Sequence, residues 1–399
     1  MKAPEFAGAF FPAQPSETMD TDDLVKREFC LRADMIHLNH AAVAPWPQRT
    51  YQAVADFAAE NARQGSLDYP RWLAVEEDLR QKLAQLINAP SEDDIALLKN
   101  TSEALSVVAH GLPWKADDNV VVSNQEFPSN RIVWESLRPR GVTVREVDLT
   151  VDSSPEDALL QATDKRTRVL AISSVQYATG LRIDIARLGA HCRRHGILLC
   201  VDAIQSVGAL DVDVQAMQAD FLMADGHKWM LGPEGLALFY CRPQLREQLE
   251  LHQYGWHMVQ AHTDFDRKDW QPATNGRRFE CGSPNMLGIH ALDASVGLLL
   301  EVGMAEVERR LLANAALLMR GIAARPRLEL LTTSQPGRHG GIVTFRHKDI
   351  ANDVIYRHLM SQRVLCAKRG GGIRFSPHFY TPTEDLERAL ALAEWAGAE

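Results

Sequence analysis

Ala224-Asp-Gly-His-Lys-Trp-Met-Leu-Gly-Pro-Glu-Gly235 places one lysine, Lys228, in a turn bounded by glycines. Apolar runs at 220–224 and 236–240 flank this turn, and each run predicts a strand. A lysine aimed rigidly between apolar residues has a lowered pKa, so its amine can form a Schiff base with a carbonyl group. We therefore take Lys228 as the first candidate catalytic residue.

An acid stands at the end of the apolar run upstream, Gly196-Ile-Leu-Leu-Cys-Val-Asp202. This pattern predicts a buried strand with the carboxylate of Asp202 at its carboxyl end. In open α/β sheets, ligands bind at that edge. A carboxylate there can keep a pyridine nitrogen protonated, so that the ring accepts electrons. Asp202 is the second candidate catalytic residue.

Two hydroxyl residues, Thr101 and Ser102, separate a short apolar run at 96–98 from a helical pattern that ends near 109. Thr101 is suited to cap a helix, and a helix N-terminus with free N–H groups binds phosphate. A phosphate site, a strand-end aspartate and a turn lysine follow one another in this chain. Together they indicate the cofactor pyridoxal 5′-phosphate.

These motifs resemble those of the class V aminotransferase family, which includes cysteine desulfurases and isopenicillin N epimerase-like enzymes. The resemblance runs from His37-Leu-Asn-His-Ala-Ala-Val-Ala-Pro45 to Ile373-Arg-Phe-Ser-Pro-His-Phe-Tyr380 and includes Arg278-Phe-Glu-Cys-Gly-Ser-Pro-Asn285. It implies the α/β architecture of fold type I, with a large, mostly parallel seven-stranded sheet and a smaller α+β domain. We expect an N-terminal arm at 1–34, a cofactor-binding domain at 35–290 and a small domain at 291–399.

The periodicity of the chain supports the same architecture. Strand-like runs alternate with helical patterns between about 95 and 245, which predicts a parallel sheet covered on both faces. We expect strands at 119–123, 167–173, 197–201 and 341–346, and helices at 48–63, 69–87, 185–195, 352–362 and 383–395. The stretch 286–324 predicts one long helix or two successive ones.

The resemblance implies further contacts to the cofactor. Phe127 would stack on its ring, and Gln176 and Gln205 would lie near the ring oxygen. His227 would lie on the phosphate side, and Ser283 would reach the phosphate from a neighbouring subunit. The last of these implies a homodimer with a shared active site.

The resemblance also implies the substrate side of the site. Arg374 would bind the α-carboxylate of an amino acid, because its planar guanidinium pairs with both oxygens of a carboxylate. Asn39, His40 and Ala42 belong to the loop that lines this side in relatives, and which of them contacts substrate is open.

Three positions depart from the family pattern. Desulfurases carry a histidine where this chain has Phe127, which can stack but cannot transfer protons. Asp225 stands where many relatives place a phosphate-binding hydroxyl; an acid there must turn away or bind a donor, so we do not assign it to the phosphate. Cys366 ends an apolar run eight residues before Arg374 (374 minus 366), which leaves no room for the loop that carries a persulfide-forming cysteine. We predict that Cys366 is buried.

These departures bear on the reaction. They favour an aminotransferase, with a C–S lyase or desulfurase as the first alternative. Epimerisation ranks third, because it needs a second acid that Phe127 cannot provide. A cofactor-bound scaffold or regulator is the non-enzyme alternative, which the intact Lys228 and Arg374 disfavour.

Composition narrows the partners and the compartment. The 399 residues are 46% hydrophobic and 24% charged, with a net charge of -9 and no basic stripe, which disfavours nucleic-acid binding. No apolar run reaches the length of a membrane span, and the N-terminus lacks the features of a secretion signal. The six cysteines show no paired spacing. We expect a cytoplasmic enzyme that binds no metal, including at the His191, Cys192 and His195 group.

Overall fold

The protein is described by a computed structural model over residues 21–150 and 154–395. Within the predicted arm at 1–34, helix α1 (Thr21–Glu28) is present, and residues 1–20 lie outside the described part.

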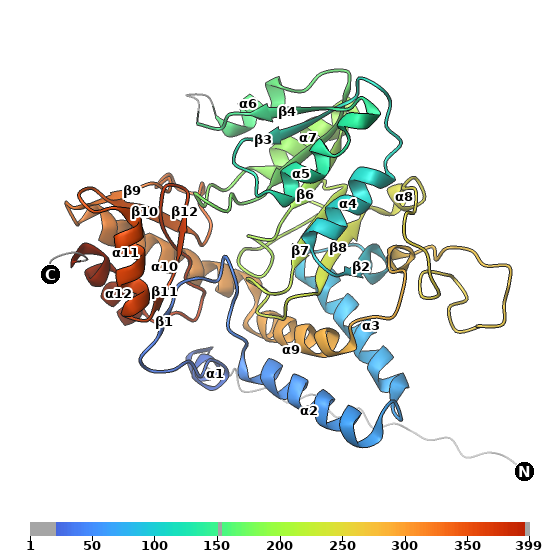
Figure 1. Ribbon diagram of the computed structural model, residues 1–399, viewed down its shortest axis with the longest axis horizontal. Coiled ribbons are helices and arrows are strands. Elements are labelled where there is room, and N and C mark those ends of the chain that lie inside the picture. Colours follow the sequence, from blue (N-terminus) through green and yellow to red (C-terminus); the bar gives the residue numbers. More distant parts are fainter. Residues whose placement is uncertain (1–20, 151–153, 396–399) are drawn as a thin grey trace, which may run out of the picture.

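The large lobe is built on a seven-stranded sheet (Figure 1). Five neighbouring strands run parallel, and β8 runs antiparallel to both of its neighbours, so the prediction of a mostly parallel sheet is confirmed. Across the sheet the order is β2 (Ile95–Leu98), β8 (Ala237–Cys241), β7 (Phe221–Asp225), β6 (Leu198–Asp202), β5 (Thr167–Ser173), β3 (Asn119–Ser123) and β4 (Thr143–Val147). Since Asp202 pairs with Ser173 and with Met223, the carboxyl ends of three strands meet at one edge.

Helices cover both faces of this sheet, because its central strands are apolar on both sides. In β6, Leu199 and Val201 face one hydrophobic core and Leu198 and Cys200 face the other. The first core includes α3 (Tyr69–Leu86), α6 (Pro155–Gln161), α7 (Ile185–His195) and α9 (Met286–Val302). The second includes α4 (Thr101–Gly111), α5 (Ser129–Glu135) and α8 (Pro243–Arg246), while α2 (Gln48–Gln64) packs on α9.

The C-terminal lobe has its own antiparallel sheet, shown in orange and red in Figure 1. Its strand order is β12 (Ala367–Arg369), β13 (Gly372–Phe375), β10 (Val343–His347) and β9 (Leu328–Leu330), and α10 (Met304–Ala323), α11 (Asn352–Ser361) and α12 (Thr383–Trp395) pack against it. β1 (Ile36–His37) pairs with β11 (Val364–Leu365), which ties the N-terminal segment to this lobe. Short 3-10 turns lie at η1 (Glu92–Asp94), η2 (Arg138–Arg140) and η3 (Gly276–Phe279).

The stretch 286–324 forms two helices, α9 and α10, which meet at Gly303 with an angle of 84°. Gly303 has a φ of 83°, a conformation that favours glycine. The predicted domain boundary after residue 290 falls inside α9, which packs against α2 and α3. Within the described ranges no single helix has the length and apolar character of a membrane span, and α9 with α10 reach that composition only as a bent pair.

Candidate active site

Lys228 lies in the turn between β7 and β8, and 9% of its surface is exposed. The turn is closed by a hydrogen bond of 2.8 Å from Gly232 N to Gly226 O. Nearby, Leu231 holds a φ of 61°, which for a leucine stores backbone strain at the site. Lys228 Nζ lies 5.7 Å from the centre of the Phe127 ring and donates no hydrogen bond to any residue that the structure describes.

The electrostatic surroundings of Lys228 favour its neutral amine. Burial lowers the pKa of the Lys228 ammonium, Asp202 opposes this effect, and Arg374 adds to it. A neutral amine is the form that attacks a carbonyl. The lysine therefore has the reactivity that Schiff-base formation requires.

Asp202 ends β6 with 2% of its surface exposed, and its Oδ1 accepts a hydrogen bond of 3.1 Å from Ile204 N. Burial raises the pKa of the Asp202 carboxyl, the bond from Ile204 lowers it, and the charge of Glu126 raises it further. A buried carboxyl whose pKa is raised needs a neighbouring cation to stabilise its anionic form. A protonated pyridine nitrogen is such a cation, so Asp202 fits the predicted cofactor.

The N-terminus of α4 differs from the prediction in one respect. Asn100 caps the helix, its Oδ1 accepting from Glu103 N at 2.9 Å, and Thr101 is the first helical residue. Thr101 N donates to Asp225 Oδ1 at 2.8 Å, so Asp225 binds a donor. Ser102 Oγ donates to Ser129 Oγ at 2.8 Å. Asn100 could not be chosen from the sequence because Asn100, Thr101 and Ser102 are three consecutive residues that are all able to cap a helix.

Glu126 is a site residue that the sequence analysis did not identify. Its carboxylate is 6% exposed and accepts hydrogen bonds from Asn130 Nδ2 at 2.7 Å, from Gln176 Nε2 at 2.9 Å and from Ser173 N. The available signal was its position next to Phe127, just beyond the carboxyl end of β3. Glu126 therefore organises the edge at which Asp202 lies.

The two predicted glutamines are already engaged by the protein. Gln176 is fully buried, its Nε2 is held by Glu126, and its Oε1 has no partner within the described residues. Gln205 donates from Nε2 to Ala41 O at 3.1 Å and accepts from Trp229 Nε1 at 2.8 Å. Gln205 thus uses both ends of its amide, whereas Gln176 keeps an unpartnered Oε1, and both contacts to a ring oxygen stay predictions.

His227 precedes Lys228 and lies beside Asp225. Its Nδ1 is 3.7 Å from Asp225 Oδ2. Burial and then the charge of Lys228 lower the pKa of His227 to about 4. A neutral histidine at this position can donate one hydrogen bond to an anion.

Arg374 lies on β13 with 3% of its surface exposed. Its Nη1 donates to Tyr177 O at 2.7 Å, whereas its buried Nε has no partner among the described residues. Burial, and then the charge of Arg369, lower the pKa of Arg374 to about 10. A buried guanidinium without an acidic partner favours a carboxylate ligand, and substrate binding by Arg374 stays a prediction.

The predicted substrate loop contains one residue with a structural role. His40 is fully buried, and its Nδ1 and Nε2 lie 2.8 Å from Ser376 O and 2.6 Å from Tyr380 Oη. Both nitrogens are occupied, so His40 is not available to a substrate. Asn39 is half-buried and accepts a backbone hydrogen bond of 2.9 Å from Ala42 N.

Ser283 and Cys366 differ in their exposure. Ser283 is exposed and lines a cavity of about 590 Å³ together with Asn100 and Gly235. Cys366 is 3% exposed, and burial raises the pKa of its thiol to about 12. The prediction that Cys366 is buried is confirmed.

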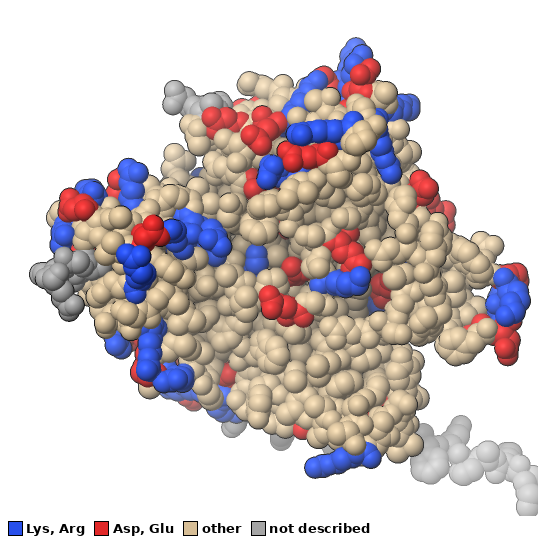
Figure 2. Space-filling view, in the orientation of Figure 1, with Lys and Arg blue, Asp and Glu red and all other residues tan. Residues whose placement is uncertain are grey.

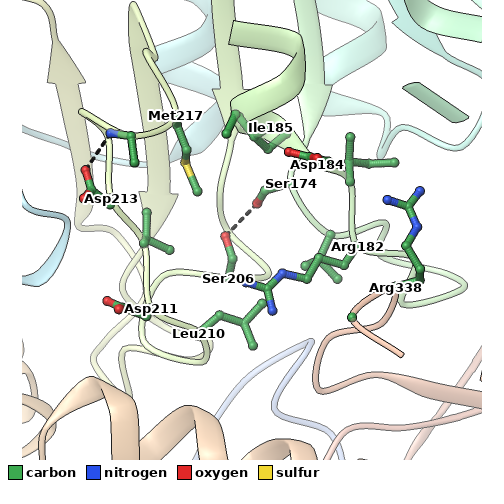
Figure 3. A pocket seen from close by; sticks show the side chains of 16 residues that line it. Ser174, Arg182, Asp184, Ile185, Ser206, Leu210, Asp211, Asp213, Met217 and Arg338 are labelled. Atoms are coloured by element: carbon green, nitrogen blue, oxygen red, sulfur yellow. Dashed lines mark hydrogen bonds between the residues drawn. The ribbon is translucent and has the colours of Figure 1, made fainter. Parts of the chain in front are cut away.

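A further cavity, of about 530 Å³, is lined by Ser174, Ser206, Arg182 and Arg338 (Figure 3). These four side chains already have protein partners. The two serine hydroxyls bond each other at 2.6 Å, Arg182 pairs with Glu308, and Arg338 pairs with Glu156. Because these four side chains are bonded to protein groups, they are not available to a ligand. The candidate active site is therefore the cluster around Lys228.

Comparisons with known proteins agree with this geometry. The family described as Aminotransferase class-V matches residues 36–388. A probable cysteine desulfurase of Methanothermobacter thermautotrophicus is 30% identical, over 92% of this chain and 96% of its own. The isopenicillin N epimerase of Streptomyces clavuligerus is 29% identical over 89% and 93%. The apo structure of cysteine desulfurase from Thermococcus onnurineus NA1 has a TM-score of 0.83 and 22% identity over 93% and 97%, a likeness in fold.

Proposed function

Because the chain belongs to the class V aminotransferase family of pyridoxal-phosphate enzymes, we propose that it breaks the carbon–sulfur bond of a sulfur-containing amino acid. The names of its relatives support this reaction over transamination, which the sequence favoured. The observation that carries an amino-acid substrate is that the Arg374 guanidinium, which has no acidic partner among the described residues, lies close enough to Lys228 and Asp202 at the sheet edge to act on the charge of Lys228.

Each residue has a defined task in this reaction. Lys228 would hold the cofactor, which would supply an electron sink that weakens the bonds at the α-carbon. Arg374 binds the α-carboxylate, which orients the substrate. With the cofactor bound, Lys228 Nζ would remove the α-proton of the substrate as the general base. Asp202 balances the positive charge that the ring nitrogen carries.

The fate of the sulfur follows from Cys366. A buried thiol whose pKa is about 12 supplies no thiolate at neutral pH to take sulfur from the substrate. We therefore place the sulfur in the released product. From cystine and water, loss of the α-proton and departure of the β-sulfur give pyruvate, ammonia and cysteine persulfide.

The test is incubation of the holoenzyme with cystine and with cysteine, in the absence of any added 2-oxo acid. Pyruvate formed in equal amount to persulfide or sulfide supports the proposal, and Lys228→Ala is the inactive control. Amino-group transfer from a panel of amino acids to pyruvate or 2-oxoglutarate, without pyruvate or sulfur release from cystine or cysteine, would establish an aminotransferase instead.

We also propose that the active protein is a homodimer. Several aromatic side chains are exposed near the segment that carries Ser283: Tyr254, Trp256, Phe265 and Trp270 are 62%, 40%, 75% and 51% exposed. This segment touches the Ser283 turn, because an added Cβ on Gly255 would meet Cys281 O at 2.1 Å. Large exposed apolar groups of this kind mark protein interfaces. Figure 2 shows few charged side chains over α2 and α9, where Tyr51 and Leu287 are also exposed.

A further inference from the structure

The N-terminus of α4 is already largely occupied by the protein itself. Glu103 N donates to Asn100 Oδ1, and Thr101 N donates to Asp225 Oδ1. Among the first three N–H groups of the helix, Ser102 N alone has no hydrogen-bond partner within the described chain. A phosphate at this helix N-terminus can therefore accept a hydrogen bond from Ser102 N. The neighbouring donor, Thr101 N, is already bound to the Asp225 carboxylate.

The carboxylate of Asp225 lies at the N-terminus of α4, where a bound anion would also lie. It ends β7, its side chain is 12% exposed, and it contacts α4 across 124 residues of sequence. Since helix N-termini attract negative charge, a carboxylate stabilises the helix there when no other anion is present. We propose that Asp225 is an internal anion, which holds Thr101 N–H in the cofactor-free chain and competes with the cofactor phosphate for it.

The charges around Asp225 explain why it does not simply exclude phosphate. Lys228 and His227 follow it in the same turn, Asp202 lies on β6, and Glu234 precedes β8. The pKa of Asp225 is raised to about 6 as the net of four effects: burial raises it most, the bond from Thr101 and the charge of Lys228 lower it, and the charge of Glu234 raises it. A phosphate dianion adds negative charge, which favours the protonated carboxyl. Competition should therefore be weakest at acidic pH and grow as the pH rises through the folded pKa.

The proposal predicts opposite effects on two measurements. Loss of Asp225 should destabilise the cofactor-free chain, because Thr101 N–H loses its partner. The same loss should strengthen the binding of a phosphorylated ligand, because a competing charge is removed. If Asp225 had a purely structural role, its loss would lower both the stability of the chain and the affinity for the phosphorylated ligand. Neither measurement depends on which reaction the enzyme performs.

Three full-length variants separate the contributions of charge and hydrogen bond. Asp225→Asn keeps an oxygen for Thr101 N and removes the charge, whereas Asp225→Ala removes both. Glu234→Gln removes an exposed charge that acts on Asp225 without contacting α4. The ligands are pyridoxamine 5′-phosphate, which forms no Schiff base with Lys228, and pyridoxamine, which lacks the phosphate.

At pH 8, Asp225→Asn and Asp225→Ala should bind pyridoxamine 5′-phosphate roughly tenfold more tightly than the wild type, the scale of one hydrogen bond to a charged group. Pyridoxamine should show no gain. Asp225→Ala should lower the denaturant midpoint of the cofactor-free chain more than Asp225→Asn, which keeps an oxygen for Thr101 N. Unchanged or weaker binding by Asp225→Asn would overturn the proposal, as would an equal gain in Glu234→Gln, because the effect would then come from long-range charge.

Discussion

At the scale of single residues, burial has opposite consequences for two nucleophiles. Burial disfavours the charged form of any side chain. It therefore lowers the pKa of the Lys228 ammonium and makes its amine available, but raises the pKa of the Cys366 thiol to about 12 and suppresses its thiolate. Burial therefore makes the lysine more nucleophilic and the cysteine less nucleophilic at neutral pH.

The first prediction concerns Lys228. Borohydride reduction of the holoenzyme should attach the cofactor covalently to this lysine, and Lys228→Ala should abolish turnover. Because its pKa is lowered, the neutral amine appears at lower pH than for an exposed lysine, so cofactor reattachment to the stripped protein should accelerate at correspondingly lower pH. Mass spectrometry of the reduced protein locates the adduct, and an adduct on another lysine would refute the assignment.

The second prediction concerns Cys366. Cys366→Ser should lower the free energy of unfolding by about 1–3 kcal/mol, because it buries a hydroxyl without a partner. The turnover of the folded enzyme should be retained, since the sulfur leaves as product. Cys281→Ser, at a half-buried position, is the control for stability. Loss of activity in Cys366→Ser with fold and cofactor intact would show that a protein thiol accepts the sulfur.

At the scale of elements, the Arg278-Phe-Glu-Cys segment joins η3 to the sheet edge and to α3. Glu280 accepts from Leu97 N at 2.8 Å and from Arg80 Nη1 at 2.6 Å, and Arg80 also pairs with Glu76. All three charged side chains are buried. Since an isolated buried charge is costly, the elements must keep this relative position.

The third prediction follows from that cluster. Glu280→Gln should reduce the free energy of unfolding by about 3 kcal/mol, because it leaves Arg80 with one acidic partner in the interior. Glu329→Gln, which breaks the exposed pair with Arg346, should leave the free energy of unfolding nearly unchanged. Urea denaturation of both variants makes the comparison, and equal losses would show that the buried cluster does not fix η3.

At the scale of the whole molecule, the site draws on both lobes. Lys228 and Asp202 come from the large sheet, and Arg374 comes from the small one. Ser283 is exposed on the single chain, beside the aromatic segment at 254–270. A partner chain would cover this surface and bring a hydroxyl to a neighbouring site.

The fourth prediction tests that arrangement. Removing the cofactor should weaken the dimer, because a ligand held by both chains stabilises their association by mass action. Ser283→Ala should raise the dissociation constant of the cofactor about fivefold, for one lost hydrogen bond of about 1 kcal/mol. Analytical ultracentrifugation and cofactor titration provide the measurements, with Ser361→Ala as the control. A fully active monomer would contradict the prediction.

The sequence by itself determined the local elements and the main chemical groups. The strands at 119–123 and 167–173 and the helices at 185–195 and 383–395 have the predicted limits, because apolar periodicity and turn residues act over short distances. Only the tertiary structure decided the long-range contacts: Asp225 with Thr101 across 124 residues, Gln176 with Glu126 across 50, and His40 with Tyr380 across 340. These depend on strand order and register, which bring distant loops to one sheet edge and which local patterns do not encode.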